Sequence, residues 1–253
     1  MAGAVISALF FARVFGVTVL RSGLTSLGLT VWVIYTADHL IDAKKVRQMA
    51  STERHRFHQK HFSALLALLL LAIIIDAVQL FFIRKQVFIG GLILASIVVI
   101  YFALQRYLKF LKELIGALLY TGGVLLIPVS IMETPLTPSL IILIVQFVLT
   151  ALTNLLLFSW FDRLRDEKDK HSSFTTVLGE RITKRALVIV FVISLILMVV
   201  QLLNFDLKSV ALIALMNSVL LVIFFDKKYF EKDDHYRLLG DAVFLLPLIY
   251  LLL

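Results

Sequence analysis

Two groups of carboxylates stand out in a chain that is otherwise strongly apolar. One lies in the stretch LFSWFDRLRDEKDKHSS, where Asp162, Asp166 and Asp169 follow directly on an apolar run. The other lies in YTADHLIDAKK, which contains Asp38 and Asp42. Residues four and seven apart share one face of a helix, so each group would point its carboxylates in one direction if the helix continues through it. Like charges at this spacing repel one another, and each group therefore needs a positive partner.

Two kinds of positive partner suit these carboxylates. The first is local: Arg163 and Arg165 lie near Asp162 in the sequence, and Lys170 can pair with Asp166, which would make an ordinary solvated loop. The second is a divalent cation, because aspartate oxygens are hard ligands and Mg²⁺ commonly takes one or two carboxylates beside water and phosphate. Carboxylates at a membrane boundary are costly and are candidates for function. Two such groups on one membrane face could hold two ions around one diphosphate.

The composition predicts an all-α integral membrane protein. Of the 253 residues, 60% are hydrophobic, whereas about half is usual for a soluble domain. The apolar runs are long and continuous, and in lipid such runs form helices because each backbone group must be satisfied within its own segment. The chain has no cysteine, which excludes disulfides and thiolate metal sites.

Nine apolar segments are each near the length that crosses about 30 Å of hydrocarbon. Eight spans remain possible, because the first segment carries Arg13 and the last is short. No repeat or flexible linker is evident, so we expect one domain over residues 1–253. The segments cover residues 2–20, 23–41, 62–83, 87–105, 113–132, 138–161, 186–203, 208–225 and 239–253.

The basic residues alternate between connections. Twenty of the 25 Lys and Arg residues fall in 43–61, 105–112, 162–185 and 226–238. The positive-inside rule places these connections, both Asp groups and the N-terminus on the cytoplasmic side, which we expect to be that of a bacterial inner membrane. The net charge of +8 is thereby explained by topology and lipid headgroups, and no nucleic-acid partner is expected.

Two further features could contact a ligand on that side. The stretch YFALQRYLKFLKE offers Tyr101, Arg106, Lys109 and Lys112 as donors to phosphate oxygens, although an amphipathic turn that only fixes topology has the same pattern. Asn154 lies two helical turns before Asp162; it could bind substrate or make an interhelical hydrogen bond.

These stretches resemble motifs of the UbiA superfamily of intramembrane prenyltransferases. The second Asp group continues as DRLRDEKDKHSSFTTVLGER, which is similar to the family's second aspartate motif and its following Thr and Leu-Gly. DHLIDA is similar to the end of the family's first motif, and YFALQRYLKFLKE to its Tyr/Lys segment. The chain departs from the first motif at Ile34 and Tyr35, where the family has Asn and Asp, and its second motif is one residue short.

The resemblance implies a helical bundle around a central cavity. It implies that Asp38, Asp42, Asp162, Asp166 and Asp169 bind Mg²⁺ and that Arg106, Lys112, Asn154 and Arg165 help to bind an isoprenyl diphosphate. The first four of these aspartates, with Tyr101 and Lys109, would be catalytic. The reaction would transfer the isoprenyl group to a lipophilic acceptor, such as an aromatic quinone precursor, next to membrane lipid. A terpene cyclase on the same fold and a non-enzymatic lipid-binding or transport protein are the alternatives.

Overall fold

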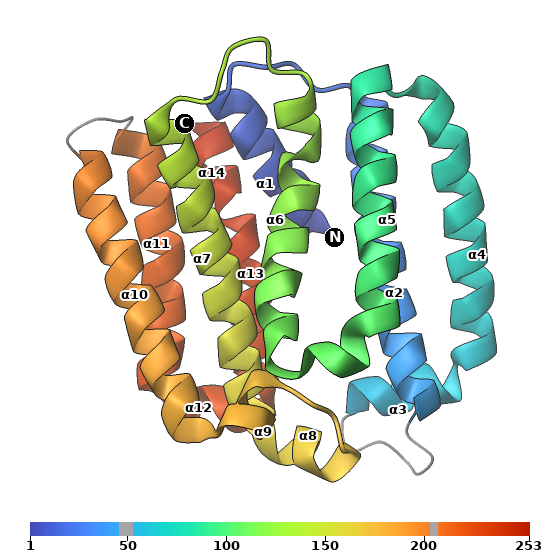
Figure 1. Ribbon diagram of the computed structural model, residues 1–253, viewed down its shortest axis with the longest axis vertical. Coiled ribbons are helices and arrows are strands. Elements are labelled where there is room, and N and C mark those ends of the chain that lie inside the picture. The colour runs from blue at the N-terminus through green and yellow to red at the C-terminus, as the bar shows by residue number, and fades with distance from the viewer. Residues whose placement is uncertain (46–52, 203–206) are drawn as a thin grey trace.

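The part of the chain that the structure describes is helical throughout. The structure is a computed structural model that describes residues 1–45, 53–202 and 207–253, and no strand occurs within these ranges (Figure 1). Among these residues, eight helical segments are long and apolar enough to cross a membrane. The predicted all-α membrane architecture is confirmed. One domain over residues 1–253 stays a prediction.

Seven of the eight candidate spans are single helices or nearly so. The eighth, Lys227–Leu252, is broken into short pieces. The single-helix spans are α2 (Arg21–Lys45), α4 (Phe62–Gln79, extended by η1, Leu80–Phe82), α5 (Lys85–Leu108), α6 (Lys112–Ser130), α7 (Pro138–Phe161), α10 (Glu180–Leu202) and α11 (Leu207–Phe225). The broken span consists of α12 (Lys227–Glu231), η3 (Lys232–Asp234), α13 (His235–Ala242), η4 (Val243–Leu245) and α14 (Pro247–Leu252).

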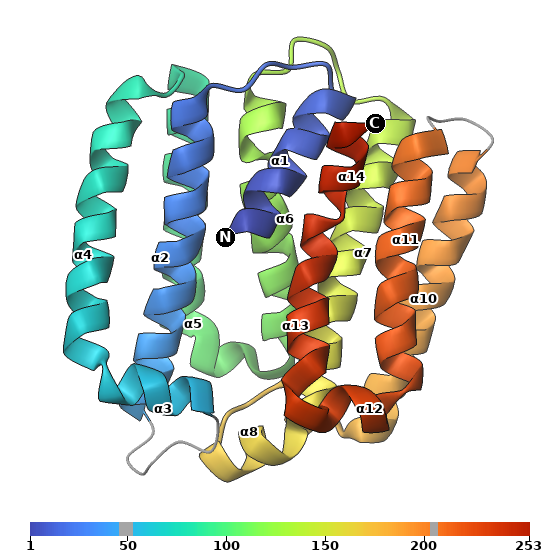
Figure 2. The same cartoon turned by 180° about the vertical axis from the view of Figure 1, so that it is seen from behind.

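The first apolar segment is shorter than predicted. The segment 2–20 forms α1 (Ala2–Val14), which is 13 residues or about 20 Å long and therefore too short to cross the hydrocarbon alone. Gly16 follows it with φ +67°, a left-handed conformation that glycine adopts without strain and that ends the helix. The charge pattern predicts that the N-terminus lies at the end of the bundle where the basic connections gather. It lies instead near the middle of the bundle's height (Figure 2).

The helices form two groups joined by α1. In both views α2, α4 and α5 stand on one side, and α6, α7, α10, α11 and α13 stand on the other (Figures 1 and 2). Helix α1 packs on α2, α6 and α14, and α5 packs on α6. The four basic connections lie at one end of the bundle, as predicted, and they contain α3 (Glu53–Lys60), η2 (Lys109–Leu111), α8 (Arg163–Asp169) with α9 (Phe174–Leu178), and α12. The side of the membrane that this end faces stays a prediction.

Helix α7 is the central helix of the second group. It begins where Thr137 accepts a hydrogen bond from the Leu140 backbone N–H at 3.3 Å and Pro138 occupies the first turn, both of which favour a helix start. It packs on α6, α10 and α11. Its Phe147 is fully buried and makes edge-on contacts with Phe11 and Phe244. This packing fixes the position of the far end of α7, where Asp162 lies.

Asp76 joins α4 to α2 inside the apolar region. Its two carboxylate oxygens accept hydrogen bonds from the hydroxyls of Ser26 and Thr30, each at 2.6 Å. Within the group formed by α2, α4 and α5, these two hydrogen bonds are a directional link between two otherwise apolar helix surfaces.

We expect Asp76→Ala to lower the free energy of unfolding by about 1–3 kcal/mol, because the partly buried hydroxyls of Ser26 and Thr30 lose their shared acceptor. Thermal unfolding in detergent measures this loss. Glu133→Ala, which removes an exposed carboxylate from the connection before α7, is the control and should leave the melting temperature unchanged. Equal melting temperatures for the two variants would contradict the link.

Candidate functional site

Asp162 lies at the junction of α7 and α8 and is almost completely buried, with 4% of its surface exposed. Both of its carboxylate oxygens accept hydrogen bonds from the last span. The Tyr236 hydroxyl donates to Oδ1 at 2.5 Å, and Arg237 donates from Nη2 to Oδ2 in an ion pair. The carboxylate is therefore neutralised by residues that lie more than seventy positions later in the chain.

Arg165 contributes to the same cluster, but less directly than the sequence predicts. Its Nη1 lies 3.6 Å from Asp162 Oδ1 and forms a closer ion pair with Asp234 Oδ1 at 2.6 Å. The local pairing of Asp162 with Arg165 is thus present as the weaker contact. Two guanidinium groups and two carboxylates together make a locally neutral cluster.

A glycine lets α13 approach α7 closely enough to make these contacts. A Cβ atom on Gly240 would lie 2.3 Å from Asn154 Oδ1 and 2.7 Å from the ring of Phe158. One turn earlier on α13, Arg237 lies over the Phe158 ring at 5.1 Å. Tyr236 stacks on Phe161 with ring centroids 4.4 Å apart. The close helix contact and the aromatic packing together orient Tyr236 and Arg237 towards Asp162.

Asp166, one turn along α8, has different surroundings. Burial raises the pKa of the Asp166 carboxyl, while the charge of Lys112 and a side-chain hydrogen bond from Ser173 act in the opposite direction. Lys112 is the first residue of α6, so the end of the Tyr/Lys segment lies near enough to the second Asp group for its charge to act on Asp166. Next to Lys112, the buried Glu113 accepts a hydrogen bond from the Phe174 backbone N–H at 2.8 Å, which joins α6 to α9.

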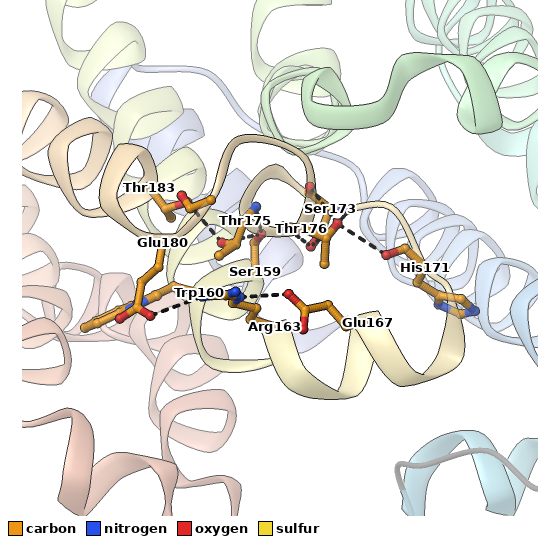
Figure 3. Close-up of polar contacts among 11 residues, drawn as sticks. Ser159, Trp160, Arg163, Glu167, His171, Ser173, Thr175, Thr176, Glu180 and Thr183 are labelled. Carbon is orange, nitrogen blue, oxygen red and sulfur yellow. Dashed lines mark hydrogen bonds and ion pairs between the residues drawn. The ribbon is translucent and has the colours of Figure 1, made fainter.

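A buried hydroxyl network holds the connection that follows α8 (Figure 3). Thr175 lies between Ser159 of α7, at 3.0 Å, and Thr183 of α10, at 3.1 Å. Ser173 and Thr176 form a reciprocal capping box at the start of α9. Thr175 thereby joins the connection to α7 on one side and to α10 on the other.

A second set of contacts, between charged side chains and the Trp160 indole, joins the same connection to α7 and α10 (Figure 3). Glu180 accepts a hydrogen bond from the Trp160 indole at 3.1 Å and pairs with Lys184 at 2.9 Å. Arg163 pairs with Glu167 at 2.8 Å and not with Asp162. Arg163 and Glu167 therefore belong to the solvated face of α8.

The structure places the other predicted residues at or near the same end. Asp38 on α2 accepts a hydrogen bond from Gln105 of α5 at 3.0 Å. Tyr101 is half-buried on α5, Lys109 is exposed at the start of η2, and Asp169 is half-buried at the end of α8. The side chains of Asp42 and Arg106 lie outside the described part of the chain.

Asn154 and Tyr35 show how the site continues into the bundle. Asn154 is buried on α7 against Gly240, and among the described residues its Oδ1 has no hydrogen-bond donor. Tyr35, which stands in the altered part of the first motif, is exposed on α2 and lies within electrostatic range of Arg237.

Sequence analysis did not identify Tyr236, Arg237 and Asp234 as site residues. It counted Arg237 among the basic residues that fix topology. The available signal was a Tyr-Arg pair immediately before the last apolar segment, and it could not be linked to Asp162 without the approach of α13 to α7.

The described carboxylates differ in how well each could bind a metal ion. Among the residues that the structure describes, no group of three or more His, Cys, Asp or Glu side chains is arranged to hold a metal. Mg²⁺ needs only one or two carboxylates when phosphate completes its shell, and Asp166 beside Lys112 suits that role. Asp162 does not, because a guanidinium already occupies its Oδ2. A hollow of about 370 Å³, lined by Pro138, Ile142 and Val200, lies at the opposite end of the bundle.

Solved structures of known proteins share this arrangement of helices. A UbiA homolog from Archaeoglobus fulgidus bound to DMAPP and Mg²⁺ matches 98% of this chain and 94% of its own, with 14% identity and a TM-score of 0.67. This chain has the UbiA fold. The structure of such a homolog from the same organism bound to GPP and Mg²⁺ gives a TM-score of 0.70 over 100% of this chain and 95% of its own. The apo structure of a UbiA homolog from Aeropyrum pernix K1 gives 0.71 over 100% and 98%.

Sequence comparison adds nothing to this likeness. The GPP-bound and apo structures are also 14% identical to this chain. No protein-family model and no curated protein matches the chain. At this identity the likeness to UbiA homologs establishes the fold and leaves the reaction to be argued from the site.

We expect Thr175→Val to lower the free energy of unfolding by about 1–3 kcal/mol, because the buried Ser159 and Thr183 hydroxyls lose their shared partner. Limited proteolysis should show faster cleavage between α8 and α10, and thermal unfolding should show a lower melting temperature. Ser172→Ala removes an exposed hydroxyl from the same connection and should behave like the wild type. Unchanged cleavage in Thr175→Val would show that the network does not hold the connection.

Proposed function

We propose that this chain is a membrane prenyltransferase. It would bind an isoprenyl diphosphate at the α8 end of the bundle and transfer the isoprenyl group to a lipophilic acceptor. The observation that carries this proposal is that the end of the Tyr/Lys segment lies beside the second Asp group: Glu113 binds the Phe174 backbone N–H of the connection after α8, and the charge of Lys112 acts on Asp166. Solved structures of a UbiA homolog bound to DMAPP or GPP and Mg²⁺ share this fold.

The carboxylates that would hold Mg²⁺ are Asp166 and Asp169 on α8 and Asp38 on α2. Asp42, whose side chain lies outside the described part of the chain, stays a prediction from the sequence. When bound there, the ion would supply positive charge to the diphosphate oxygens. Lys112 and Lys109 would donate hydrogen bonds to the same oxygens as charge grows on them. Asp162 is left out of the metal set, which departs from the site that the sequence predicts.

The reaction would proceed by loss of the diphosphate. The bond between C1 of the isoprenyl chain and the diphosphate oxygen breaks, and its electron pair leaves with the diphosphate. The acceptor then forms a bond to C1 and gives up a proton. Loss of the diphosphate leaves an allylic cation on the isoprenyl chain. Water would quench this cation, so the site must exclude water until the acceptor reacts. The two ends of this reaction, diphosphate release and prenylated product, can be measured separately.

Purified protein in lipid nanodiscs, incubated with Mg²⁺ and radiolabelled geranyl or geranylgeranyl diphosphate, should release diphosphate. Chelation of Mg²⁺ should abolish the release. Mass spectrometry with quinone-precursor acids as acceptors identifies the product. A cyclised product formed without acceptor would show that the chain is a terpene cyclase. A folded protein that neither binds nor cleaves any isoprenyl diphosphate would contradict the proposal and favour a non-enzymatic role.

Asp166→Asn should lower the rate of diphosphate release by about 100-fold or more, because it removes a charge that holds the cation at the leaving group. Glu167→Gln is the matched control. It changes the next carboxylate on the same helix, which pairs with Arg163 on the exposed face, and the rate should stay within about threefold of the wild type. Equal rates for the two variants would refute the assignment of Asp166.

A further inference from the structure

The geometry at Asp162 differs from that of a metal ligand. Its Oδ2 receives the guanidinium of Arg237, and its Oδ1 receives the Tyr236 hydroxyl at 2.5 Å. A divalent cation bound to the same carboxylate would lie against a positively charged guanidinium, and the two charges would repel one another. The cation and the arginine are therefore alternatives at this position.

The arginine is built into the site and is not a mobile surface residue. Its side chain is 23% exposed, lies over the Phe158 ring at 5.1 Å, and donates a second hydrogen bond from Nε to the Tyr236 hydroxyl at 3.2 Å. The close approach of α13 to α7 at Gly240 brings the backbone of Arg237 to Asp162. Release of the carboxylate would leave a largely buried guanidinium without its partner, which is strongly unfavourable.

The charges around the pair also disfavour a second cation. Arg165 pairs with Asp234 at 2.6 Å and lies 3.6 Å from Asp162, so two carboxylates already face two guanidinium groups. The charge of Lys112 acts on Asp166, one turn away on α8. Of the three carboxylates of the second group, Asp162 is therefore the one that binds an arginine.

We propose that the Arg237 guanidinium takes the place of a divalent cation at Asp162, so that Asp162 is not one of the metal ligands of the second Asp group. Arg237 would then be a positioning residue that supplies a fixed positive charge on the α13 side of the site. A fixed protein charge needs no metal and is in place before the reaction begins. The part of this inference that concerns metal and diphosphate rests on the proposed function.

The first test uses the protein in nanodiscs without metal or ligand. A thermal double-mutant cycle compares Asp162→Asn, Arg237→Gln and the double variant. Each single variant should melt several degrees below the wild type, because it leaves a buried partner unpaired, and the double variant should lose clearly less than the sum. Arg237→Lys keeps the charge and should recover part of the loss. Additive losses would overturn the inference whether or not any ligand binds.

The second test counts metal ions. Mn²⁺ binding in the presence of inorganic pyrophosphate is measured by electron paramagnetic resonance for the wild type, Asp162→Asn and Asp166→Asn. We expect Asp162→Asn to bind as many ions as the wild type, with affinity within about threefold, and Asp166→Asn to bind at least about tenfold more weakly. Loss of an ion in Asp162→Asn would overturn the inference and leave the proposed function standing. Coupling in the first test without any Mn²⁺ or diphosphate binding would keep Arg237 at Asp162 and remove the proposed function.

Discussion

The neutralisation of Asp162 is the interaction on which this end of the bundle depends. A carboxylate that is almost fully buried at the end of an apolar helix is unfavourable unless a charged partner and hydrogen bonds surround it. Removal of one partner from such a pair typically costs about 3–5 kcal/mol. Tyr236 and Arg237 supply the hydrogen bonds and the positive charge that Asp162 needs, and in doing so they hold α13 against the end of α7.

Further polar contacts join the neighbouring helices around Asp162 and Arg237. The charge of Lys112 acts on Asp166 in α8, and the Thr175 network joins the connection after α8 to α7 and α10. The link from Glu113 to the Phe174 backbone ties the Tyr/Lys segment to the same connection. Residues from α6, α7, α8 and α13 are thereby held at one end of the bundle, where the proposed ligand would contact them.

The sequence predicted the features that depend on composition and helical periodicity. Long apolar runs and alternating basic connections were enough for the helices and for the common end of both Asp groups. The length of α1 was predicted wrongly, because the apolar character of residues 15–20 continues past the turn at Gly16. The partners of Asp162 could not be predicted, since Arg237 looks like any other basic residue at a span end until Gly240 brings α13 onto α7. The local pairing with Arg165 was predicted and is present as the longer contact.

An experimental structure of the protein with Mn²⁺ and geranyl S-thiolodiphosphate, an analogue in which a carbon–sulfur bond that resists cleavage replaces the carbon–oxygen bond at C1, tests the central claim most directly. Anomalous scattering locates each Mn²⁺ independently of the protein density. The account predicts a Mn²⁺ ion bound to Asp166, with Arg237 and Tyr236 still on Asp162. A Mn²⁺ ion bonded to Asp162, with Arg237 moved away from the carboxylate, would contradict it.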